Sequence, residues 1–152
     1  MSYDFLVFDP EVPPRNDDGF REWFESEIRD GDDNSSSSEE VVESKALKAF
    51  YAEMREIFTP ISGPDAVDLP ASSPPIRQLR SGDYGFRPHS IYLGFRWEAA
   101  DMARASASTI AKHLGLGFYF VSSEYGQAVF PDGHTVWPTG KYPGRGTGKK
   151  LQ

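Results

Sequence analysis

The stretch SIYLGFRW at residues 90–97 decides the fold class, because it has the clearest strand pattern in the chain and leads directly into a helix. From Glu98 to Leu114, small and apolar residues recur at helical spacing and share one face. Small side chains permit a close approach to a sheet, and Gly115 and Gly117 are typical of a helix end. We therefore predict a strand over residues 90–97, followed by a helix that packs on a sheet.

Two segments lie before this strand. Residues 76–97 look like a hairpin whose two arms are interrupted by GDYGF at residues 82–86. The connector at residues 59–76 contains five prolines, so it forms neither a helix interior nor a central strand. Because long irregular segments are often functional, a cleft beside residues 59–76 is one candidate site.

The N-terminal third of the chain predicts one strand and two helices. Tyr3–Phe8 is mostly apolar, which is typical of a central strand. A first helix would be capped by Asn16 or Asp17. Its inward face follows the helical period and consists of Phe20, Trp23, Phe24 and Ile28.

The segment after this helix is polar. Residues 29–38, RDGDDNSSSS, are rich in turn formers and predict a mobile surface loop. The second helix begins either at a capping box of Ser37 and Glu40 or at Ser44, and it ends before Pro60. Both starts agree with the apolar spacing that follows, so the sequence leaves them open.

The remaining strands complete the order β-α-α-β-β-α-β-β. Apolar runs predict strands at residues 117–122 and 128–130, with a last edge at residues 135–137. This order predicts an α+β fold, an antiparallel sheet of four to five strands with helices packed on one face, as in a ferredoxin-like sandwich. We assign residues 1–138 to a single domain and residues 139–152 to a flexible basic tail.

The amino-acid composition limits the kinds of site and the location that we expect for this chain. The chain has 152 residues, of which 38% are hydrophobic, and this suits one buried core. It contains no cysteine, which excludes disulfides, a thiolate nucleophile and cysteine-based metal sites. The N-terminus lacks a signal-peptide pattern, and no apolar run approaches the roughly 20 residues of a membrane span. We expect a cytoplasmic protein with no membrane partner.

Charge is unevenly distributed along the chain. The formal net charge is −7, but residues 1–58 carry 16 acidic and 6 basic side chains, whereas residues 59–152 carry 7 acidic and 10 basic ones. An acidic protein repels phosphate backbones, so we expect no nucleic-acid partner. An acidic face can instead steer a basic protein toward it, and the simpler alternative is that the charge only provides solubility.

Motifs for catalysis are missing from the sequence. The three histidines, His89, His113 and His134, are too far apart for paired metal ligands. The glycine-rich residues 144–150 depart from the P-loop pattern, and no serine stands in a nucleophile elbow. Carboxylates at the ends of the predicted elements cannot be told apart from helix caps. We therefore assign no catalytic, metal or cofactor residue, and the sequence favours a non-enzymatic chain.

Two features are candidates for a surface that binds a protein partner. The first is an acidic stretch whose alternative is a solvated loop, and its members are Asp30, Asp32, Asp33, Glu39, Glu40 and Glu43. The second is a set of aromatic residues expected in turns, namely Tyr84, Phe86 and Tyr125. Exposed aromatics are enriched at interface anchors, and their alternative is packing over the sheet edge.

Several strings resemble a family of uncharacterised small bacterial proteins. They are MSYDFLVFDP (1–10), FTPISGP (58–64), SIYLGFRW (90–97), HLGLGF (113–118) and PDG (131–133). The likeness covers roughly residues 1–134. Proteins of this kind resemble the immunity partners of polymorphic toxins, which are small, acidic, cytosolic and non-enzymatic. The resemblance implies a chain that covers the active site of a basic toxin domain with acidic groups that mimic substrate phosphates.

Three functions follow as hypotheses. The first is an immunity-type protein that binds and neutralises a cognate bacterial toxin through its acidic surface. The second is a small enzyme or ligand-binding domain with a cleft near residues 59–76. The third is a homo-oligomer that associates through a sheet edge or the aromatic turns. The sequence leaves the oligomeric state and the identity of the toxin open.

Overall fold

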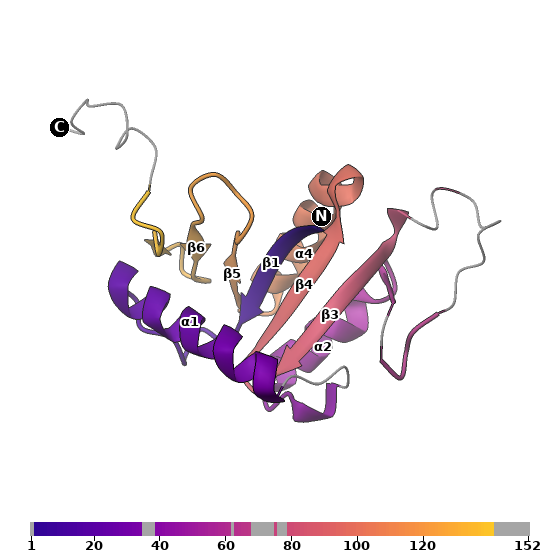
Figure 1. Ribbon diagram of the computed structural model, residues 1–152, viewed down its shortest axis with the longest axis horizontal. Coiled ribbons are helices and arrows are strands. Elements are labelled where there is room, and N and C mark those ends of the chain that lie inside the picture. Colours follow the sequence, from indigo (N-terminus) through magenta and orange to yellow (C-terminus); the bar gives the residue numbers. More distant parts are fainter. Residues whose placement is uncertain (1, 35–38, 62, 68–74, 76–78, 142–152) are drawn as a thin grey trace.

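A computed structural model of the chain describes residues 2–34, 39–61, 63–67, 75 and 79–141, and for residues 30–34 and 39 it describes the backbone alone. Its strands are β1 Ser2–Phe8, β2 Thr59–Pro60, β3 Ser81–Arg87, β4 Ser90–Arg96, β5 Gly117–Tyr119, β6 Ala128–Val129 and β7 Thr135–Val136. Its α-helices are α1 Asp17–Asn34, α2 Lys45–Met54 and α4 Ala100–His113, and two 3-10 turns span Glu39–Val41 and Trp97–Ala99. Figure 1 shows how these elements are arranged.

The strands form one sheet in the order β2-β3-β4-β1-β5-β6-β7. Only β2 and β3 are parallel, and every other neighbouring pair is antiparallel. The central strand β1 pairs with β4, where Phe5 faces Leu93, and with β5, where Val7 faces Phe118. The α+β class is therefore confirmed, whereas the sheet is larger than the expected four to five strands and is mixed rather than antiparallel.

Helices cover both faces of this sheet (Figure 1). On one face, Tyr3, Phe5 and Val7 of β1 belong to a core shared with α2 and α4. On the opposite face, Leu6 and Phe8 belong to a second core shared with α1. The expectation of helices on one face was wrong, because β1 is buried on both sides and each side needs a cover.

The strand and helix at residues 90–113 agree with the sequence pattern. Ala103, Ala107 and Ala111 of α4 are fully buried against the sheet, so their small side chains permit close packing. The backbone of Gly115, just after α4, has a φ of 73°. Glycine adopts this left-handed conformation without a steric penalty, so the helix ends where the sequence predicted.

The expected break at residues 82–86 is instead part of the regular strand β3. A Cβ atom built on Gly82 would lie 2.5 Å from Cε1 of the Phe95 side chain. Gly82 therefore marks a close approach of a core ring to the strand, not a turn. The actual turn between β3 and β4 lies at Pro88 and His89.

The expected loop at residues 29–38 is also corrected in part. The backbone of residues 29–34 continues helix α1, while residues 35–38 lie outside the described part. Of the two starts considered for α2, Ser44 is confirmed, because its side-chain oxygen accepts a hydrogen bond from the Leu47 backbone N–H at 3.2 Å. Half of connector 59–76 and most of tail 139–152 lie outside the described residues. No described helix is long and apolar enough to cross a membrane.

Candidate functional site

Helix α1 begins at a well-formed N-terminal cap. The Asn16 side-chain oxygen accepts a hydrogen bond from the backbone N–H of Gly19 at 2.7 Å. Asp17 and Asp18 occupy the first turn, where the helix dipole favours negative charge. Asp17 also accepts a hydrogen bond from the backbone N–H of Trp137 at 2.9 Å, so the helix start is tied to the end of the domain.

The inner side of α1 is fixed to the sheet by aromatic rings. Phe20 is fully buried, and its ring centroid lies 5.2 Å from that of Phe8 and 5.3 Å from that of Tyr119. The ring of Phe24 lies 4.8 Å from that of Tyr119 in an edge-to-face arrangement. Aromatic pairs of this geometry stabilise packing beyond the area that they bury. These contacts fix which side of α1 faces outward.

A second anchor holds α1 further along its length. The Ser90 hydroxyl donates a hydrogen bond to the Glu27 carboxylate at 2.6 Å. The Arg87 side chain donates through Nε to the Glu27 carbonyl oxygen at 3.0 Å. Because Glu27 lies well beyond the aromatic anchor, the helix is attached to β3 and β4 as well as to β1 and β5.

The outward side of α1 is strongly acidic. The 18 residues of the helix include eight acidic and two basic side chains. Asp18, Glu22 and Glu25 are exposed and recur at i, i+4 and i+7, which places them on one stripe of the helix. Asp18 forms an ion pair with Arg21 at 2.9 Å. Part of the acidic surface of the N-terminal half is thus carried by a helix with fixed side-chain spacing, and exposed Arg29 follows Glu25 one turn later.

The acidic residues named from the sequence are only partly brought together. The backbone of Asp30, Asp32 and Asp33 lies in the last turns of α1, and their side chains, like that of Glu39, lie outside the described part. Glu40 is exposed in the 3-10 turn. Glu43 is exposed and lies 3.6 Å from Nε2 of His89.

The expectation of aromatic anchors at turn tips was wrong for Tyr84 and Phe86. Both lie in β3 and are only 3% and 1% exposed. The Tyr84 hydroxyl donates a hydrogen bond to the Phe58 carbonyl oxygen at 2.7 Å, and burial raises its pKa. Tyr125 is half-buried in an irregular segment, where its carbonyl oxygen accepts a hydrogen bond from Thr139 Oγ1 at 2.9 Å. Its role in binding stays a prediction.

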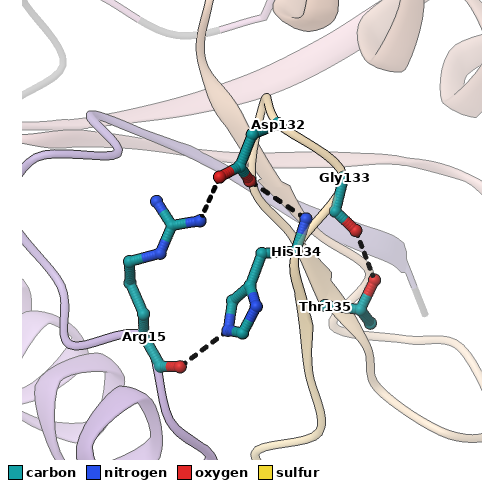
Figure 2. Close-up of polar contacts among 5 residues, drawn as sticks. All are labelled: Arg15, Asp132, Gly133, His134 and Thr135. Carbon is teal, nitrogen blue, oxygen red and sulfur yellow. Dashed lines mark hydrogen bonds and ion pairs between the residues drawn. The ribbon is translucent and has the colours of Figure 1, made fainter.

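A polar network joins the start of α1 to the turn between β6 and β7 (Figure 2). Arg15 Nη2 and Asp132 Oδ2 form an ion pair at 2.5 Å, and the other Asp132 oxygen accepts a hydrogen bond from the His134 backbone N–H at 3.0 Å. The ring Nε2 of His134 lies 2.8 Å from the Arg15 carbonyl oxygen. A carbonyl oxygen only accepts, so Nε2 carries the proton and donates it.

This network is a structural clamp and not an acid–base pair. The Asp132 carboxylate contacts the backbone of His134 and not its ring, so it does not orient the imidazole for proton transfer. The His134 backbone N–H and the Arg15 guanidinium hold the pKa of the Asp132 carboxyl below its ordinary value. The clamp therefore ties the last hairpin to the N-terminal side of α1.

We expect Asp132→Asn to lower the melting temperature slightly at pH 7, because it removes an exposed ion pair. The pKa of Asp132 is depressed in the folded state, so its contribution is complete above the ordinary value of 3.8 and is lost as the pH falls below it. The difference in melting temperature between the two proteins should shrink as the pH falls from 7 to 3. A difference that stays constant over this range would show that the carboxylate charge is not what stabilises the turn.

The sheet face on which α1 packs also contains, where α1 does not cover it, a groove of about 400 Å³. One of its walls is Ile61, which belongs to the described part of connector 59–76. Strand register places Gly94 between Asp4 and Asp83, so two carboxylates flank a glycine on the groove floor. Tyr92 donates a hydrogen bond to Asp4 Oδ2 at 2.7 Å. Burial, together with this hydrogen bond, raises the pKa of Tyr92 above its ordinary value.

The groove can hold polar groups, but its residues do not form a nucleophile and base pair. Tyr92 stays protonated at neutral pH and acts as a donor. The Asp4 carboxylate accepts hydrogen bonds from the Tyr92 and Ser2 hydroxyls, and these two bonds fix its orientation. Among the residues that the structure describes, no group of three or more histidines or carboxylates is placed to hold a metal ion.

Sequence reasoning missed this groove because it depends on strand register. Asp4, Asp83 and Gly94 are far apart in the chain and meet only when β1, β4 and β3 are aligned. The available signal was the alternation of polar and glycine residues in residues 83–87 and 92–96, which marks the solvent-facing side of two strands.

Comparisons of the chain with protein-family models, with curated proteins and with solved structures found no match. The resemblance to immunity proteins therefore stays an expectation. Any proposal about function therefore rests on two features of the structure, the acidic outer side of α1 and the groove over Gly94.

Proposed function

We propose that this chain is a non-enzymatic, cytoplasmic immunity-type protein that binds and neutralises a basic toxin domain with the acidic outer side of α1. The observation that carries the proposal is the exposed acidic row of Asp18, Glu22 and Glu25 on α1, a helix whose 18 residues include eight acidic and two basic ones. Its aromatic side is packed on the sheet, so the acidic row faces outward. Supporting features are the family resemblance and the acidic N-terminal half of the chain.

The physical argument is one of preorganised charge. Carboxylates on a mobile loop must be ordered when a partner binds, whereas those on a packed helix already have fixed spacing. Asp18, Glu22 and Glu25 present a row of negative charge over two turns. Such a row complements the basic surface with which a nuclease-type toxin would hold phosphates, and it accelerates association at low salt.

The test begins with affinity capture at low salt, followed by affinity measurement with the purified partner. The variant Asp18→Asn, Glu22→Gln, Glu25→Gln should bind at least about tenfold more weakly, which corresponds to about 1.4 kcal/mol of binding free energy. Its binding should also depend less on salt concentration, because fewer charges are screened. Calorimetry at two salt concentrations measures both effects.

A matched control separates position from net charge. Glu53, Glu56 and Asp101 are exposed on α2, just after it and on α4, and Asp101 pairs with Arg104 at i+3 just as Asp18 pairs with Arg21. The variant Glu53→Gln, Glu56→Gln, Asp101→Asn should bind like the wild type. Equal weakening by both variants would mean that net charge, and not α1, governs binding.

A second function is favoured by the groove over Gly94, because it lies beside Ile61 at the predicted connector site. In this alternative the chain binds a small polar ligand there, between Asp4 and Asp83. The two functions give different outcomes in the same experiment. A ligand-binding domain would capture no stoichiometric protein, and neutralising α1 would leave its ligand affinity unchanged.

A further inference from the structure

The sheet is wider than the helical layer on the face opposite α1. The core beneath α2 and α4 contains residues of β1, β3, β4 and β5, and none of its described members comes from β6 or β7. The sheet nevertheless continues past β5 into these two strands. Between α4 and the β5–β6 pair this mismatch leaves a groove of about 450 Å³. Its volume is in the range of small-molecule sites.

The sheet side of this groove is mainly apolar, with polar groups from Gln127 and from Ser108, Thr109 and Lys112 of α4 around it. Phe118, Phe120 and Val129 contribute to it from the sheet side, with Leu116 at the end of α4. The rings of Phe118 and Phe120 lie 4.7 Å apart, and Val129 is paired with Phe118 across the strands. Phe118 and Leu116 are buried, whereas Phe120 and Val129 are partly exposed, and an apolar body that covers these two side chains gains free energy.

The two charged side chains at the rim of the groove differ in whether they already have a partner. Of the described residues that line the groove, Lys112 and Asp132 are charged. Asp132 is engaged by Arg15 and by the His134 backbone N–H. Lys112 is exposed in the last turn of α4 and forms no ion pair with any residue in the described ranges. The groove thus offers one cation beside an apolar wall.

We propose that this groove binds a small molecule with an apolar body and a single anionic head group, such as a medium-chain carboxylate. The apolar body would cover Phe118, Phe120 and Val129, and Lys112 would pair with the head group. The Thr109 hydroxyl lines the α4 side and can donate to the same head group, whereas the Ser108 hydroxyl donates to the Ala105 carbonyl oxygen at 3.4 Å. The site lies across the sheet from α1, so it does not depend on the proposed toxin binding.

Decanoate is the probe, and 1-decanol is its neutral match. Binding is measured by displacement of the fluorescent reporter 8-anilinonaphthalene-1-sulfonate from the full chain. We expect Lys112→Gln to weaken decanoate binding at least tenfold and to leave 1-decanol binding unchanged. Lys112 is exposed on α4, so folding should be preserved, and circular dichroism checks this.

A second variant tests the groove itself. Thr109→Trp places a large ring over the groove from an exposed helix position and should abolish binding of both probes. Lys48→Gln removes an exposed lysine from α2, away from the groove, and should bind like the wild type. The proposal is overturned if decanoate fails to displace the reporter at millimolar concentration. It is equally overturned if Lys112→Gln binds decanoate like the wild type, or if Thr109→Trp retains binding.

Discussion

Replacing Phe20 with alanine should reduce the free energy of unfolding by roughly 3–5 kcal/mol, the usual cost of removing a buried phenylalanine ring. Phe20 is fully buried and contacts the rings of Phe8, Tyr119 and Phe130 in the core beneath α1. The cavity left by the substitution would be surrounded by aromatic rings that cannot collapse into it. Because domains of this size are stable by only about 5–15 kcal/mol, Phe20→Ala should unfold at clearly lower urea concentration.

Urea denaturation followed by circular dichroism measures this effect. Trp97→Ala is the control, since this larger ring is 44% exposed and its removal leaves no closed cavity. The account also predicts that backbone amides of α1 exchange faster in Phe20→Ala, because the aromatic anchor holds the helix to the sheet. A loss of less than about 1 kcal/mol would mean that α1 is not anchored at Phe20.

Gly82→Ala should destabilise the protein by roughly 1–3 kcal/mol, the usual cost of overpacking a core. The added Cβ would lie 2.5 Å from the ring of Phe95, which no real contact permits. Phe95 is 2% exposed, and its ring packs 4.9 Å from Phe58 and 5.7 Å from Phe5. The ring therefore has no free space into which it can move without displacing these neighbours.

Gly85→Ala is the matched control, because it lies in the same strand on the opposite face. There a new Cβ would have its nearest neighbour, the Tyr92 carbonyl oxygen, at 3.7 Å, which is ordinary contact. Alanine also lowers the conformational entropy of the unfolded chain, so this substitution should be neutral or slightly stabilising. Thermal melts compare the two. Equal melting temperatures for Gly82→Ala and Gly85→Ala would contradict the close approach of Phe95.

These two glycines show where sequence reasoning fails and why. In the sequence, Gly82 and Gly85 resemble the glycines of a turn. The pattern therefore predicted a break between the two hairpin arms at residues 82–86. In the fold they sit inside β3, because Phe95 from the neighbouring strand occupies the space over Gly82. The side chain that fills this space lies on the neighbouring strand, so the residues next to Gly82 in the sequence do not indicate it.

The extent of α1 was missed for a similar reason. Residues 29–34 contain three aspartates, one glycine and one asparagine, which favour turns in isolation. Just before this segment, Ser90 and Arg87 from distant strands hold Glu27, and such long-range support has no signal in the local sequence. By contrast, the strand at residues 90–97 and the helix after it were predictable, because their apolar spacing is local and uninterrupted.

For the proposed binding surface, the sequence predicted the acidic charge but not the helix that carries it. The charge imbalance of residues 1–58 is visible in the composition. That some of these charges lie on the outward side of a packed helix depends on the core between α1 and the sheet. Tyr84 and Phe86 were misassigned because a strand inside a sheet and a turn with aromatics share residue types. The polar and glycine alternation in residues 83–87 and 92–96 marks the solvent-facing sides of β3 and β4, but the groove over Gly94 also needs the alignment of these strands with β1.

The central claim is that α1 neutralises a toxic partner, and a protection assay tests it most directly. The basic domain captured at low salt is expressed in bacterial cells together with the wild-type chain, with the Asp18→Asn, Glu22→Gln, Glu25→Gln variant or with the Glu53→Gln, Glu56→Gln, Asp101→Asn control. Growth is recorded while equal amounts of folded chain are verified. The account predicts growth with the wild type and the control and arrest with the α1 variant. Full protection by the α1 variant, or a captured domain that does not arrest growth when expressed alone, would contradict it.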